Sequence, residues 1–172
     1  LGRMLALAFL VLVPSAFAED ALGRTANLGG VERFCLWLDV RPGSLDPFGL
    51  TGWDVVATVE DEVGRLAEDH AVPLDRDCLE ALTADDPSQA VLHLLIVERD
   101  GAIVTLGSVV TNASAGARRY ERAIVYQELP VLVGAETIGD GAELLQTLRT
   151  SAATAFEGIV RAWRQANPRE RW

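Results

Sequence analysis

The sequence is poor in the residues from which most enzyme and metal sites are built. Its 172 residues include only two cysteines and two histidines. None of them is spaced as C-x-x-C, H-E-x-x-H or His-x-His, the spacings on which thioredoxin-type redox sites and many zinc sites depend. A glycine-rich phosphate loop with its lysine and the G-x-S-x-G elbow of serine esterases are also missing. We therefore expect no catalytic residues, no metal site and no cofactor.

Lysine is missing altogether, and every basic side chain is an arginine. The chain carries 25 acidic and 15 basic residues, for a formal net charge of −10. A protein this acidic is repelled by the phosphates of nucleic acids and by anionic lipid surfaces. We expect no nucleic-acid partner.

The longest apolar run lies near the N-terminus and is too short to cross a bilayer. It covers Met4–Val13, whereas a membrane-spanning helix needs about 20 apolar residues. Arg3 precedes the run, and Ala16-Phe17-Ala18 follows it as a small-x-small cleavage pattern. This arrangement predicts a signal peptide over residues 1–18, cut before Glu19. It predicts a periplasmic or secreted protein with no transmembrane segment after cleavage.

The rest of the chain has the length of one domain. Residues 19–31 are small, polar and rich in glycine, which predicts a flexible lead-in. A single domain is expected over residues 32–168, followed by a short C-terminal tail over residues 169–172.

Hydrophobic periodicity predicts a strand and then a helix in the first half of this domain. Residues 34–40 alternate between two faces, as in a strand. Thr51 is a plausible N-cap with Asp54 three residues later, an imperfect capping box. Apolar residues then recur at helical spacing, which predicts an amphipathic helix over residues 52–70. The expected stripe is Val56, Val59, Val63, Leu66 and His70.

Three β-rich runs and a second helix are expected in the remainder. Asp100-Gly101 favours a tight hairpin turn between two of the runs. A third run covers residues 118–133, and the closing helix ends at Asn167-Pro168. The predicted order is β-α-β-β-β-α. It indicates an α+β two-layer sandwich with a mostly antiparallel sheet and two helices on one face.

The first of these runs is apolar on both sides over residues 91–97. Val91, Leu95 and Val97 share one face with His93, while leucines and an isoleucine occupy the other. Such a strand is either central and covered by loops, or packed against a partner or a second copy of the chain. Exposed tryptophans often anchor interfaces. The candidate interface residues are Trp37, Trp53, Val91, His93, Leu95 and Val97.

The two cysteines are expected to form a disulfide. Cys78 lies among three acids and one arginine between positions 75 and 80, and negative neighbours raise a thiol pKa rather than activate it. An even cysteine count in an exported chain favours a Cys35–Cys78 bridge. Such a bridge would stabilise the fold by about 4 kcal/mol in the chain-entropy model. Because Cys35 points away from the expected core, the segment around Cys78 must pass around an edge of the sheet.

Two stretches resemble a loose group of exported bacterial proteins. The first is "DPFGLTGWDVVATVEDEVGRLAEDHAVPL", with a Gly-Leu-Thr entry to the helix, and the second is "VRAWRQANP" at the end of the chain. The resemblance covers residues 34–168. It implies the same order of elements and an exported location, and it implies no catalytic residues.

These observations favour a non-enzymatic protein of the bacterial envelope that acts by contact with a protein partner or by self-association. One alternative is a small-ligand or carbohydrate-binding module that uses Trp37, Trp53 or Tyr126. A second alternative is a hydrolase with a site made of carboxylates.

Overall fold

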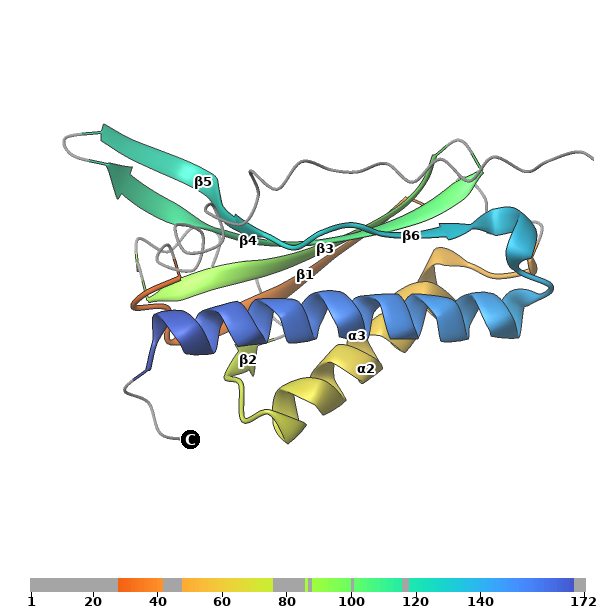
Figure 1. Ribbon diagram of the computed structural model, residues 1–172, viewed down its shortest axis with the longest axis horizontal. Coiled ribbons are helices and arrows are strands. Elements are labelled where there is room, and N and C mark those ends of the chain that lie inside the picture. The colour runs from red at the N-terminus through yellow and green to blue at the C-terminus, as the bar shows by residue number, and fades with distance from the viewer. Residues whose placement is uncertain are drawn as a thin grey trace, which may run out of the picture.

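The protein folds as an α+β structure with two long helices on one face of a mixed sheet, as Figure 1 shows. The computed structural model describes residues 28–41, 48–75, 86, 88–99, 101–115 and 118–168. Within these residues the sheet has six strands. The predicted fold class and the placement of both helices on one face are confirmed.

The elements follow one another with short connections. They are β1 (Arg33–Arg41), α2 (Gly52–Asp69), β2 (Leu74–Asp75), β3 (Gln89–Arg99), β4 (Ala102–Ala115), β5 (Arg118–Gln127), β6 (Val131–Gly134), the 3-10 helix η2 (Ala135–Thr137) and α3 (Gly141–Ala166). Across the sheet the order is β2-β1-β3-β4-β5, and β6 also pairs with β4.

The sheet is mixed rather than mostly antiparallel at its β1 side. β1 runs parallel to β3 along its whole length and parallel to the short strand β2. Parallel neighbours need a crossover connection, and α2 lies between β1 and β3 in the chain. The remaining pairs, β3–β4, β4–β5 and β4–β6, are antiparallel. β2 has only two residues and is too short to give a periodic signal in the sequence.

The third β-rich run forms two strands instead of one. β5 pairs with the second half of β4, and β6 pairs with the first half along the same edge. Residues 128–130 separate β5 from β6. Pro130 has no backbone N–H to donate to a ladder, which explains the interruption at this point.

Both helices begin with side-chain caps. In α2, the hydroxyl of Thr51 accepts a hydrogen bond from the Asp54 backbone, and the Asp54 carboxylate accepts one from the Thr51 backbone at 2.7 Å. The Thr51 hydroxyl also donates to the Asp54 carboxylate at 2.7 Å, and this bond together with the one from the Thr51 backbone holds the pKa of Asp54 below its usual value. The predicted capping box is therefore complete. In α3, Asp140 accepts from the backbone N–H of Glu143 at 2.9 Å.

The buried helix stripes are shifted slightly from the predicted ones. Val55 rather than Val56 begins the buried side of α2, which continues through Val59, Val63 and Leu66. In α3 the buried side begins at the fully buried Leu144. α3 also packs closely on the sheet at Gly107, where a Cβ atom would lie 3.1 Å from Ala155 Cβ. The absence of a side chain at Gly107 lets the helix approach β4.

Hydrogen bonds join the N-terminal turn to the end of α3. Residues 28–31 were expected to belong to a flexible lead-in, but here they form a packed turn with Leu28 and Val31 buried. The Asn167 side chain accepts from Gly30 N at 2.8 Å and donates to Leu28 O at 2.9 Å. The other predicted lead-in residues and the tail over residues 169–172 lie outside the described part of the chain.

Candidate functional site

The two faces of the sheet are covered very differently. On β3, Ala90, Leu92, Leu94 and Ile96 are buried in the hydrophobic core with the helices. Residues 91, 93, 95 and 97 alternate with them and therefore point to the other face. Both α2 and α3 lie on the core side, so no described helix covers this other face (Figure 1). We call it the open face.

The strand register arranges the open face in four rows that cross the sheet. The first row contains Cys35, Val91, Val110 and Ile124, and the second contains Trp37, His93, Ser108 and Gln127. The third row contains Asp39, Leu95 and Leu106, and the fourth contains Arg41, Val97, Val104 and Leu132. Four of the six predicted interface residues are thus the odd-numbered residues of β3, namely Val91, His93, Leu95 and Val97. A fifth, Trp37, lies beside His93 on β1.

Burial changes along these rows. In the first row Cys35, Val91 and Val110 are buried. In the later rows the apolar residues of β3 and β4 are only partly buried, and Leu132 on β6 is 64% exposed. The accessible part of the open face is therefore a band of apolar side chains across β1, β3, β4 and β6.

Trp37 is the aromatic residue of this band. It is 41% exposed, and its ring lies over the ring of His93, with centroids 4.9 Å apart and planes tilted by 30°. Asp39 and Arg41 follow on the same face of β1 and form an ion pair at 3.2 Å. An apolar centre beside polar groups at the rim is the usual anatomy of a protein interface.

His93 has an unusual environment for a polar residue. Its Nε2 atom is buried and has no hydrogen-bond partner within the described residues. Burial lowers the pKa of His93 below the ordinary 6.5, and the nearby Arg41 acts in the same direction while Asp39 opposes it. The neutral imidazole is therefore the form that the folded protein favours.

We predict that His93 makes the fold less stable on acidification. Because its folded pKa lies below the unfolded 6.5, the unfolded chain binds the proton first as the pH falls. The contribution of neutral His93 is fully present above about pH 6.5 and is lost as the pH falls from there through the folded pKa. Urea unfolding of the wild type and of His93→Gln at about pH 7.5 and pH 5.5 measures this. Between these two pH values the free energy of unfolding should fall less for the variant than for the wild type. An equal fall in both proteins would contradict the prediction.

Trp53 does not belong to this surface. It is 82% exposed and stands at the second residue of α2, on the helix side of the sheet. Tyr126 pairs with Val109, whose side chain lies in the core, and its hydroxyl donates to Glu128 at 2.7 Å. Trp37, Trp53 and Tyr126 therefore do not come together as one aromatic site.

Four apolar residues of the open face that are at least partly exposed were missed from the sequence: Val104, Leu106, Ile124 and Leu132. Strand β4 alternates, with Ile103, Thr105, Gly107 and Val109 toward the helices, so its even-numbered apolar residues could have been assigned to the other face. Leu132 could not, because its place depends on how β6 pairs with β4.

Cys35 lies at the junction of β1 and β2. It is buried, no free cysteine occurs in the described part of the chain, and Cys35 pairs across the parallel ladder with Asp75. Cys78 lies outside the described residues, so the predicted bridge stays a prediction. β2 is the edge strand beside β1, and the expected path of the segment around Cys78 also stays a prediction.

The described ranges contain neither a membrane-spanning helix nor a cluster of metal ligands. No described helix is long and apolar enough to cross a membrane. Among the same residues, no group of three or more histidine, cysteine, aspartate or glutamate side chains could hold a metal ion. Comparison of the chain with protein-family models, with curated proteins and with solved structures found no match.

Proposed function

We propose that this protein is a non-enzymatic domain of the bacterial envelope that binds another protein through its open face. The observation that carries the proposal is the exposed Trp37 at the edge of an apolar band that no described helix covers. Tryptophan is enriched among the residues that supply most of the binding energy at interfaces. The partner is either a different envelope protein or a second copy of this chain.

The composition of the band supports contact with protein rather than with a small molecule. Its side chains come from four strands and therefore spread across the width of the sheet. Contiguous apolar surface rimmed by polar groups is typical of protein interaction sites. The carboxylate hydrolase has less support, because two described cavities each contain a single carboxylate, Glu157 in one and Glu68 in the other, and such a site needs a pair.

Export with a Cys35–Cys78 bridge is the second part of the proposal. The ladder places Asp75 beside Cys35, and Cys78 follows Asp75 by three residues, a stretch that spans at most about 10 Å. The cysteine Cα atoms of a disulfide lie about 4.4–6.8 Å apart, so this connection is short enough for the bridge. Together with the N-terminal signal pattern, the bridge is consistent with an oxidising compartment.

Site-specific photocrosslinking tests the open face. Benzoylphenylalanine is placed at Leu132 on the open face or, as the control, at the exposed Thr154 of α3. We expect a covalent protein adduct from position 132 and none from position 154 in cells that export the protein. The mass of the adduct distinguishes a second copy from a different partner.

Trp37→Ala provides the energetic test of the same surface. If Trp37 anchors the contact, its loss should cost about 2 kcal/mol or more of binding free energy, and the adduct from position 132 should decrease strongly. The proposal is wrong if both positions give the same adducts, or if the protein is monomeric and position 132 gives none.

A further inference from the structure

The rings of Trp37 and His93 lie against each other on neighbouring strands of the open face. The two residues are partners in the parallel register of β1 and β3. Their ring centroids are 4.9 Å apart, and the ring planes are tilted by only 30°. Trp37 is exposed whereas His93 is partly buried, so the indole is the outer of the two rings. The indole therefore covers part of the imidazole.

The covered imidazole is poorly suited to carry a proton on both nitrogens. Nε2 of His93 is buried and has no hydrogen-bond partner among the described residues. In the imidazolium both ring nitrogens are donors, so Nε2 would then be a charged N–H group without an acceptor. A buried donor that makes no hydrogen bond destabilises the fold, and it does so more strongly when it is charged. The closed arrangement of the two rings is therefore compatible with neutral His93.

The groups around His93 do not replace the missing acceptor. Burial is the main cause that lowers the pKa of His93, while Asp39 raises it and Arg41 lowers it. These two residues follow Trp37 on the same face of β1 and pair with each other at 3.2 Å. On β4, the residue opposite His93 is Ser108, which carries no charge. An indole face attracts a cation, but this attraction and that of Asp39 do not outweigh the effect of burial.

We infer that protonation of His93 separates the two rings, so that the open face contains a pH-sensitive switch. Nε2 of the imidazolium can donate to water only when the imidazole and the indole move apart. Trp37 then becomes more exposed and loses the neighbour that holds it in place. One consequence rests on the proposed function: a partner that covers Trp37 and His93 disfavours the charged imidazole, so acid should weaken the contact.

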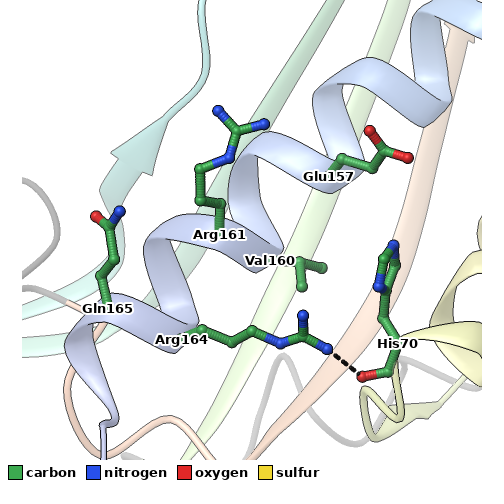
Figure 2. Close-up of a pocket in the computed structure, with 6 residues that line it drawn as sticks. All are labelled: His70, Glu157, Val160, Arg161, Arg164 and Gln165. Atoms are coloured by element: carbon green, nitrogen blue, oxygen red, sulfur yellow. Dashed lines mark hydrogen bonds between the residues drawn. The ribbon is translucent and has the colours of Figure 1, made fainter.

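Proton NMR of the imidazole Hε1 signals tests whether Trp37 covers His93. The only other histidine is His70, at the C-terminal end of α2, where Arg164 donates to its backbone carbonyl at 2.7 Å (Figure 2). His93→Gln assigns the two signals. We expect Trp37→Ala to raise the pKa of His93 toward the ordinary 6.5, whereas Trp53→Ala leaves it unchanged. The His70 signal should be the same in both variants. A pKa of His93 that does not change in Trp37→Ala overturns the inference.

Fluorine NMR of the protein labelled with 5-fluorotryptophan tests whether the rings separate. The difference in a fluorine chemical shift between H2O and D2O reports contact with water. For Trp37, assigned with Trp37→Phe, this difference should increase at the pH where His93 titrates, and the increase should be absent in His93→Gln. The buried Trp163 reports unfolding of the whole domain and should not respond at that pH. The inference is overturned if Trp37 does not respond, or if it responds only together with Trp163.

Crosslinking from position 132 distinguishes the switch from the proposed protein contact. The adduct should decrease between about pH 7.5 and about pH 5.5 with the wild type and stay constant with His93→Gln. If the rings separate but neither pH gives an adduct, the proposed function fails and the switch stands. If the adduct is the same at both pH values, the proposed function stands and control of the contact by His93 is overturned.

Discussion

Replacing Trp163 with alanine is expected to lower the free energy of unfolding by about 3–5 kcal/mol, the usual cost of truncating a buried tryptophan. Trp163 is fully buried and packs edge-to-face on Phe34, with ring centroids 5.5 Å apart. Its indole N–H also donates to Val31 O at 2.7 Å. The substitution removes core volume and a bond between α3 and the N-terminal turn together.

Urea unfolding followed by circular dichroism measures the effect, with Trp53→Ala as the matched control. Trp53 is almost fully exposed, so its loss should change stability by no more than about 0.5 kcal/mol. Trp163→Phe keeps a ring and removes the N–H donor, and it should cost about 1 kcal/mol for the lost bond, plus any loss of packing. If the alanine variant does not fold, the phenylalanine variant still measures the contribution of residue 163 to the free energy of unfolding. Similar stabilities for Trp163→Ala and Trp53→Ala would contradict the assignment of Trp163 to the core.

Reduction of the proposed Cys35–Cys78 bridge is expected to lower the free energy of unfolding by about 4 kcal/mol in the chain-entropy model. The bridge closes a loop that contains α2 and joins β1 to the segment after β2. In the unfolded chain this loop restricts conformational freedom, so its removal favours unfolding. The loss should be the same for the reduced wild type and for the double variant Cys35→Ala/Cys78→Ala.

The intact mass of the exported protein, with and without reduction before thiol labelling, decides whether the bridge exists. We expect a mass that begins at Glu19 and no label until the protein is reduced. If two thiols are labelled without reduction, the bridge does not exist and no longer supports an oxidising compartment. In that case reductant should also leave the unfolding curve unchanged.

The local elements of the fold could be predicted because their signals lie within short stretches of sequence. Thr51 and Asp54 form the cap of α2 three residues apart, and the apolar spacing of α3 is that of one helix face. Gly101 adopts the positive φ that the hairpin between β3 and β4 requires. The doubly apolar character of residues 91–97 also followed from simple alternation along one strand.

The pairing of distant segments was decided only by the tertiary structure. β1 lies parallel to β3, two residues after Pro73 become an edge strand, and the third β-rich run divides to pair with the two halves of β4. Leu132 reaches the open face through that division. The hydrogen bond from Arg164 of α3 to the backbone carbonyl of His70 likewise joins residues that are 94 positions apart in the chain. Periodicity records which side of a segment is apolar, whereas the neighbour that covers it is selected by packing of the whole chain.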